Sequence, residues 1–353
     1  MSARRVTLAD VASTAGVAPS TASLVLSGRA SELRISREVE QRVLAAADEL
    51  QYRPNIVSAA LRTGTTRTIG LVSDTVATSQ LAGDMIKGAL EAARERGVLL
   101  LFGETEGDPN VERSLVQAMH DRQVDGVILT SMFTRTLTVP TGLGTGPAVL
   151  LNALATPKAP LPAVVPDEVE AGRAAAHVLL EAGHREDIHL IGAGPTIHDV
   201  PPWSVAALER LTGIYEVFQA AGVTVAGGHQ CYEWLPDDGF ATTRAVLRAT
   251  RPRALICFND RLAMGVYQAL DDAGLTVPTD VSVVSFDDHP IASWIRPKLT
   301  TVALPHYELG HTAVDVLFGE IDRQRRSAPT EVGVVHRVPM PVRLRESVAP
   351  PGH

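Results

Sequence analysis

The chain has 353 residues, which suggests two or three domains at roughly 100–200 residues each. Hydrophobic residues make up 45% and charged residues 20%, so a packed core is expected and a largely disordered chain is excluded. No run reaches about 18 apolar residues, and no apolar secretion core follows the first residues. We therefore expect a cytoplasmic protein without membrane association, in which Cys231 and Cys257 are reduced and buried.

The net charge of −8 argues by itself against a nucleic-acid partner, but the charge is unevenly distributed. Residues 1–67 carry nine arginines and six carboxylates, a balance of +3 that leaves −11 for the remainder. A mildly basic head on an acidic body is typical of a DNA-binding module joined to a second function. The same balance is also common in surface helices, so charge alone does not decide the function.

Two short helices joined by a tight turn are predicted near the start of the chain. Apolar residues recur with helical spacing from Leu8 onward, Thr7 is a suitable N-cap, and Gly16 provides a left-handed stop. A second helix begins at Pro19, which suits the first helical position, and ends before Gly28. Its apolar residues can pack inward while short polar residues face out, as in a helix-turn-helix whose second helix reads DNA.

A third helix is expected after its N-cap, Ser36. Its apolar stripe is predicted to consist of Val39, Val43, Leu44, Ala47 and Leu50. The helical spacing fits a plain three-helix bundle as well as a DNA-binding head. The segments VTLADVASTAGVAPSTASLVLSG and SREVEQRVLAAADELQYRPN favour the second, because they resemble the DNA-binding head of the lac repressor (lactose/galactose repressor) family over residues 6–62.

The resemblance implies which side chains contact DNA. The implied set is Thr7, Leu8, Pro19, Ser20, Thr21, Ser23, Leu24, Tyr52, Asn55, Ser58, Leu61 and Arg62. Many family members have Arg where this chain has Leu24, and an arginine there reads a guanine, whereas leucine cannot donate to guanine but can contact a thymine methyl. Family members also usually cap the second helix with Ser where Ala18 stands.

Residues 54–66 are predicted to form a hinge helix and linker. Only about two helical turns fit between Asn55 and Gly64, and so short a helix is marginal in water. One interpretation is a linker that packs on the core. The resemblance implies instead a hinge helix that forms on DNA beside its dimer mate, with Leu61 wedged between base pairs and Arg62 in the minor groove.

From Thr68 onward, apolar runs alternate with helical patterns. Strands are expected at 69–73, 98–102, 127–130, 148–151, 188–191, 254–258 and 281–286. Helices are expected at 80–96, 111–122, 170–182, 206–221, 239–249, 261–273 and 307–323. This alternation predicts an α/β fold of doubly wound parallel sheets in two lobes that bracket a ligand cleft.

The resemblance to the lac repressor family continues to about Arg345 and implies a two-lobed, periplasmic-binding-protein-like effector domain. It is strongest at VDGVILTS, LLEAGHREDIHLIGAGP, ERLTGIYEVF and ICFNDRLAMGVYQALDDAGLTVPTDVSVVSFDD. Where Asp-Asn is frequent in the family, this chain has Asp167-Glu168. The expected effector-binding residues are Asp74, Thr130, Arg210, Trp234, Asn259 and Asp287, with Arg210 matching the family arginine that hydrogen-bonds the effector.

The domain boundaries that follow are 1–53 for the helix-turn-helix head, 54–66 for the hinge, 67–345 for the effector and dimerisation domain, and 346–353 for a tail. No nucleotide-binding loop, nucleophile elbow or metal-ligand spacing occurs, so we expect no catalytic residues, metal or cofactor. The predicted function is a transcription repressor that binds a palindromic DNA operator as a homodimer under control of a small effector. A free solute-binding protein and a sugar-processing enzyme are the alternatives.

Overall fold

The computed structural model describes residues 6–31, 33–53, 64–76, 79, 83–157, 159, 161–202, 204–327 and 333–351. The chain divides into two compact units, Met1–Thr66 and Arg67–His353. The predicted hinge contacts Asn55, Ser58, Leu61 and Arg62 lie outside the described residues. Across the described ranges, no helix has both the length and the apolar character needed to span a membrane.

The first unit contains three helices, α1 (Leu8–Ala15), α2 (Pro19–Leu26) and α3 (Arg37–Glu49). At the start of α1, the Asp10 amide donates to Thr7 Oγ1 at 3.3 Å while the Thr7 amide donates to Asp10 Oδ2 at 2.8 Å. Gly16 ends the helix with a φ of 66°. Ser36 Oγ accepts from the Val39 amide at 3.3 Å and caps α3. These local stops and caps confirm the three predicted helices.

The core of the first unit is small and built largely from alanine and valine, with Val11, Ala22 and Val43 fully buried. One predicted core position is wrong, because Leu44 is 48% exposed. The inward face of α3 instead runs through Val43, Ala46, Ala47 and Leu50. These positions keep the i, i+3, i+4, i+7 spacing, and Leu44 lies about 100° further round the helix.

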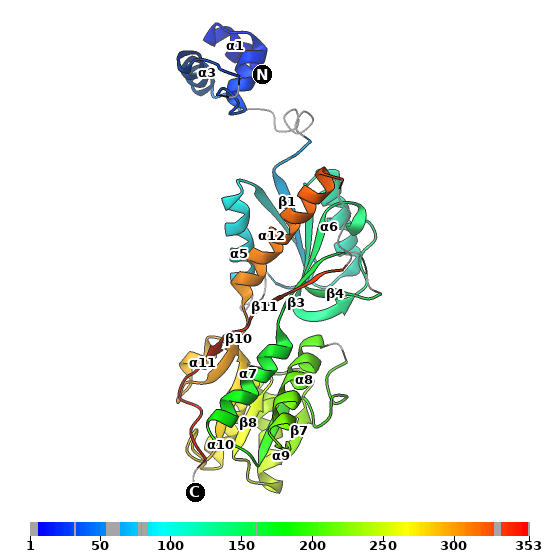
Figure 1. Ribbon diagram of the computed structural model, residues 1–353, viewed down its shortest axis with the longest axis vertical. Helices are drawn as coiled ribbons and strands as arrows, with labels where there is room; N and C mark the ends of the chain where they lie inside the picture. The colour runs from blue at the N-terminus through cyan, green and yellow to red at the C-terminus, as the bar shows by residue number, and fades with distance from the viewer. Residues whose placement is uncertain are drawn as a thin grey trace. The chain divides into compact units, whose positions relative to one another are not determined.

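The second unit contains two six-stranded sheets, each of which forms one lobe with its helices (Figure 1). The N-lobe sheet has the order β11-β5-β4-β3-β1-β2 and is parallel throughout. Its strands are β1 (Thr68–Ser73), β2 (Leu99–Glu104), β3 (Val127–Leu137), β4 (Ala148–Ala155), β5 (Ala163–Pro166) and β11 (Val335–Val338). Its helices are α5 (Gly83–Glu95), α6 (Pro109–Asp121), the 3₁₀ turn Leu143–Thr145 and α12 (His306–Arg325).

The C-lobe sheet has the order β12-β10-β9-β8-β6-β7 and is parallel except for the β10–β12 pair. Its strands are β6 (Ile188–Gly192), β7 (Gly227–Gln230), β8 (Ala254–Cys257), β9 (Ser282–Asp287), β10 (Thr300–Ala303) and β12 (Val342–Arg343). Its helices are α7 (Glu168–Glu181), α8 (Val205–Ala220), α9 (Pro236–Ala249), α10 (Asp260–Asp272) and α11 (Ile291–Trp294). The predicted pair of doubly wound sheets is confirmed, and both cysteines are free and buried as expected.

The chain passes between the lobes three times, from β5 to α7, from β10 to α12 and from β11 to β12. The crossing segments are hydrogen-bonded to the neighbouring strands. The Asp167 amide donates to the Val338 carbonyl at 2.9 Å, and the Ala303 amide donates to the Pro341 carbonyl at 2.8 Å. Beyond the last crossing, Ser347 is fully buried and its Oγ donates to the Val283 carbonyl at 2.6 Å, so the start of the segment 346–353 packs on β9.

Glycines on both partners bring pairs of helices into close contact. A Cβ on Gly172 of α7 would lie 2.1 Å from the Arg210 carbonyl oxygen, and one on Gly213 of α8 would lie 2.0 Å from the Val169 carbonyl oxygen. The α5/α12 and α9/α10 pairs have the same reciprocal arrangement. Since α7 and α8 touch backbone to backbone, side chains from the start of α7 and the middle of α8 can meet beneath the lobe surface.

Gly213→Ala should destabilise the second unit by about 1–3 kcal/mol, because the added methyl forces α8 away from α7. Gly319→Ala, on α12 where no atom lies within 4 Å of an added Cβ, is the matched control. It should be neutral or stabilising by about 0.5–1 kcal/mol. All three tryptophans follow residue 67, so urea titration followed by tryptophan fluorescence reports this unit alone. Equal midpoints for the two variants would contradict the packing argument.

Candidate functional site

The second helix of the first unit presents the residues expected to contact DNA. Pro19 and Ser20 are exposed, and Thr21, Ser23 and Leu24 are half-buried. The N-cap position, Ala18, contributes no side-chain cap. Three other expected contacts also have structural roles, since Thr7 belongs to the α1 capping box while Leu8 and Tyr52 pack against the core. Among the residues expected to contact DNA, those at the exposed start of α2 are therefore the most accessible to a DNA groove.

A cavity of about 740 Å³ lies in the second unit and is lined by both lobes. Four of the expected effector-binding residues line it: Arg210, Trp234, Asn259 and Asp287. Asp74 and Thr130 are not among the lining residues. Asp74 accepts from the Met132 amide at 2.9 Å and pairs with Arg135 at 3.2 Å, so its oxygens are used within the N-lobe. Thr130 is 2% exposed.

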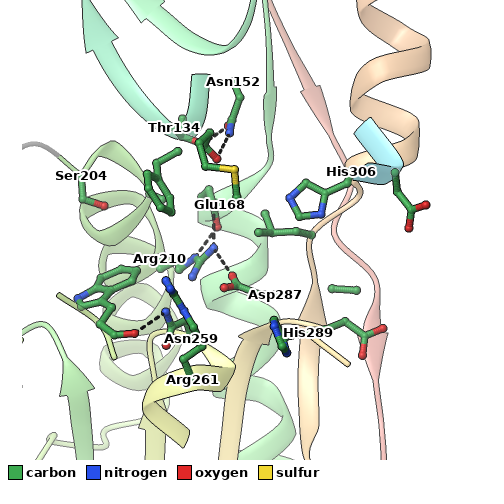
Figure 2. A pocket seen from close by; sticks show the side chains of 18 of the residues that line it. Thr134, Asn152, Glu168, Ser204, Arg210, Asn259, Arg261, Asp287, His289 and His306 are labelled. Atoms are coloured by element: carbon green, nitrogen blue, oxygen red, sulfur yellow. Dashed lines mark hydrogen bonds and ion pairs between the residues drawn. The ribbon is translucent and has the colours of Figure 1, made fainter. Parts of the chain in front are cut away.

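Arg210 of α8 forms a buried, bidentate ion pair with Glu168, the first residue of α7 (Figure 2). Its Nε donates to Glu168 Oε2 at 2.6 Å and its Nη2 to Oε1 at 3.0 Å. Burial raises the pKa of the Glu168 carboxyl, and the guanidinium opposes that shift. Burial lowers the pKa of Arg210, but the Glu168 and Asp287 carboxylates outweigh it and the net shift is upward. The guanidinium therefore keeps its charge inside the protein.

The loop after β9 is held in an unusual backbone conformation. Asp287 and Asp288 have φ values of 105° and 56°, in the left-handed region that L residues rarely adopt. Asp287 Oδ1 lies 3.3 Å from Arg210 Nη2, and Asp288 Oδ1 accepts from Arg345 at 2.6 Å. These contacts stabilise the turn and place the Asp287 carboxylate at the cavity wall.

Asn259 and Trp234 are connected to each other and to the ends of neighbouring strands. Asn259 Oδ1 accepts from the Leu262 amide at 2.8 Å and caps α10, and its Nδ2 donates to the Trp234 carbonyl at 3.1 Å. The Trp234 indole N–H donates to the Gly192 carbonyl at 3.2 Å, and its ring meets Phe258 edge-on. The hydrogen-bonding groups of both side chains are thus satisfied within the protein. Asn259 therefore positions Trp234, and Trp234 can contact a ligand only through its ring.

The structure adds lining residues that sequence reasoning missed. They include Phe133 and Asn152 from the N-lobe, Tyr232, Arg261 and His289 from the C-lobe, and His306 at the start of α12. The Asn152 side chain donates to the Ser131 and Met132 carbonyls, where the β3–β4 register shifts, and so supports the segment that carries the exposed Phe133. Arg261 and His289 had a sequence signal, because they follow Asn259-Asp260 and Asp287-Asp288 at strand ends.

Burial lowers the pKa of His306 and of His289 below the ordinary histidine value, so both are neutral at pH 7. Burial also raises the pKa of Asp260 well above its usual range, and this side chain accepts from Thr301 and from the His289 amide. Within the described ranges, no group of three or more His, Cys, Asp or Glu residues is arranged to hold a metal ion. The cavity combines aromatic faces with a few polar groups, as small-molecule sites do.

A helix-turn-helix head followed by a two-lobed α/β unit with a cavity lined by both lobes defines a ligand-responsive DNA-binding protein. Residues 7–55 match the model of the bacterial regulatory proteins of the lacI family, and residues 175–348 match the periplasmic binding protein-like domain. The ribose operon repressor of Escherichia coli K12 is 30% identical over 321 residues, covering 89% of this chain and 93% of its own. The chain belongs to the lacI family and is a DNA-binding transcription regulator.

Two further comparisons agree with this assignment. The transcriptional repressor PurR of Photobacterium profundum is 29% identical over 325 residues, covering 89% of this chain and 92% of its own. A crystal structure of the lac repressor dimer bound to operator and the anti-inducer ONPF superposes with a TM-score of 0.76 over 98% of this chain and 100% of that one. At 24% sequence identity, this likeness shows the shared fold.

Arg210→Ala should destabilise the second unit by about 3–5 kcal/mol, because it leaves the Glu168 carboxylate buried without its partner. Arg337→Ala is the matched control, since Arg337 pairs bidentately with Glu209 at 2.7 and 2.8 Å but is 36% exposed. Its loss should cost at most about 1 kcal/mol. Urea titration followed by tryptophan fluorescence measures the free energy of unfolding of both variants. Comparable decreases would show that burial does not make the Arg210 pair more important for stability than an exposed pair.

Proposed function

We propose that this protein is a transcription repressor that binds a palindromic operator as a homodimer, with an affinity set by a small polar effector in the interlobe cavity. The observation that carries the proposal is the combination, in one chain, of a helix-turn-helix whose second helix has an exposed start and a ligand-sized cavity between two lobes. The proposal places the protein in the cytoplasm, where bacterial DNA lies.

The proposed DNA contacts are those implied by family resemblance, with α2 in the major groove. Leu24 supports this placement, because it is half-exposed and is not among the partly buried residues packed on the core of the first unit. Ser20 and Thr21, short and polar beside it, suit phosphate or base-edge contacts. Asn55, Ser58, Leu61 and Arg62 are proposed contacts in the segment outside the described residues.

The proposed effector is a sugar or a related polar metabolite. The described cavity wall combines the Trp234 ring and the exposed aromatics Phe133 and Tyr232 with the Asp287 carboxylate. An aromatic face packs on the C–H side of a sugar ring while polar groups meet its hydroxyls. The name of the ribose operon repressor, one of the relatives, is consistent with such a ligand.

The operator test starts from selection of random double-stranded DNA with the purified protein. We expect a palindrome whose half-sites lie about one helical turn apart, bound with an affinity that falls steeply as salt rises. Leu24→Arg should then select guanine at one symmetric position in each half-site, because arginine donates to guanine O6 and N7. Leu44→Arg, at an exposed position of α3, is the control and should leave the selected sequence unchanged. If the Leu24→Arg variant selected the same bases as wild type, α2 would not lie in the major groove.

The homodimer has support at the edge of the N-lobe sheet. On the edge strand β2, Leu99 and Phe102 are 60% and 39% exposed, and Leu90 of the adjacent α5 is 49% exposed. An exposed apolar edge strand tends to associate with another chain. We therefore propose that this edge forms the dimer interface.

Leu99→Glu should shift the protein from dimer to monomer in sedimentation velocity and weaken operator binding. Leu344→Glu, at a leucine that is 73% exposed and lies beyond β12 in the C-lobe, should do neither. A dimer that tolerates Leu99→Glu would place the interface elsewhere.

A further inference from the structure

Arg210, the family's effector-binding arginine, has almost no donor left for a ligand. Its Nε and Nη2 donate to Glu168 at 2.6 and 3.0 Å, its Nη1 to the Phe258 carbonyl at 2.5 Å, and its Nη2 also to Asp287 at 3.3 Å. These bonds use four of the five guanidinium N–H groups. The side chain is 3% exposed, and the ring of Phe286 covers its plane at 4.6 Å. A ligand that used this fork would have to displace a buried carboxylate.

Arg261 is in the opposite situation. It lies in the first turn of α10, is half-buried and lines the same cavity (Figure 2). Its Nε is sealed from solvent and finds no acceptor in the part of the chain that the structure describes. A buried donor without a partner is unfavourable, so a small movement of the side chain that brings this donor to an acceptor atom on a ligand in the cavity would be favourable. Arg261 is thus a cation with unused donors at the cavity wall.

Two neighbouring groups complete a donor and acceptor set. His289 Nδ1 accepts from the Ile291 amide at 3.0 Å, so the neutral ring carries its proton on Nε2 and can donate from there. Asp287 uses Oδ1 toward Arg210, and its Oδ2 accepts from none of the described residues. A ligand hydroxyl can accept from Arg261 or His289 and donate to Asp287.

The cavity lining carries an excess of negative charge without a ligand. Its carboxylates outnumber its arginines by six to three: Asp84, Glu168, Glu233, Asp287, Asp288 and Glu308 against Arg210, Arg261 and Arg343. A carboxylate or phosphate on the ligand would add further negative charge beside these carboxylates. In a family that frequently has Asp-Asn at 167–168, an amide at 168 would leave Arg210 with only the longer contact to Asp287, at 3.3 Å, among its carboxylate contacts. The carboxylate of Glu168 neutralises the positive charge of Arg210.

We propose that Arg261, rather than Arg210, binds the acceptor oxygen of the effector, and that Glu168, by occupying Arg210, restricts the site to uncharged polyhydroxy ligands. This inference rests on the proposed function and deepens it. Arg261 acts as the ligand contact, and Glu168 acts as a specificity determinant through Arg210.

The test uses neutral sugars paired with their acidic counterparts: D-ribose with D-ribose 5-phosphate, D-glucose with D-glucuronate, D-galactose with D-galacturonate, and cellobiose with cellobionate. The melting temperature of the full chain is measured with each at saturating concentration, since a bound ligand stabilises the folded state. In wild type, only neutral members should raise it. Arg261→Gln should weaken binding of the best neutral sugar about ten- to hundredfold, and Arg248→Gln, at an exposed position of α9, should leave it unchanged.

Glu168→Gln supplies the converse result. By releasing Arg210 it should let the acidic partner of the best neutral sugar raise the melting temperature. Should this variant fail to fold, the wild-type panel and Arg261→Gln still decide the proposal.

Three outcomes overturn the inference: an acidic member that stabilises wild type as well as its neutral partner, an Arg261→Gln variant that binds like wild type, or no response to any neutral member. The operator selection, run on the same preparation, separates this failure from the failure of the proposed function. A protein that still selects a palindrome loses only the ligand assignment, whereas one that selects no DNA loses the proposed function.

Discussion

The buried ion pair between Glu168 and Arg210 is the constraint on which the C-lobe wall of the cavity depends. Neither charge is tolerable there alone, because an unpaired buried ion costs several kcal/mol, so the pair fixes α7 against α8. The remaining guanidinium donors reach the Phe258 carbonyl at the end of β8 and Asp287 at the end of β9. One side chain therefore connects two helices and two strand ends, and the first crossing between the lobes leads directly into it.

The glycines of the helix pairs make this arrangement possible. Gly172 and Gly213 let α7 and α8 approach until backbone meets backbone, which is the separation at which a carboxylate on one helix and a guanidinium on the other form a bidentate pair. The same device at α9/α10 sets the start of α10, where Asn259 and Arg261 lie. Polar groups at the cavity are thus placed by close packing of small residues some distance away.

The site separates residues that hold the structure from residues with capacity left for a ligand. The Asn259 amide caps α10 and donates to the Trp234 carbonyl, and the Arg210 guanidinium donates to carboxylates and to a carbonyl. Arg261, His289 Nε2 and Asp287 Oδ2 retain hydrogen-bonding capacity among the described residues. A family site can therefore keep its residue types while the contact with the ligand passes to a neighbour.

The sequence alone determined the three N-terminal helices, the doubly wound α/β character and the family, because caps, left-handed stops and hydrophobic periodicity act within a few residues. It also found four of the residues that line the cavity, since polar groups at strand ends are recognisable in one dimension. It missed short strands such as β7, whose sequence GGHQ has no apolar pattern, and it placed the exposed Leu44 in the core. Only the tertiary structure decided that Glu168 meets Arg210, that Arg261 has donors to spare, and that Asp74 and Thr130 lie outside the cavity lining. Hydrogen-bonding capacity is a property of neighbours in space, and residues 42 positions apart become neighbours only when the helices pack.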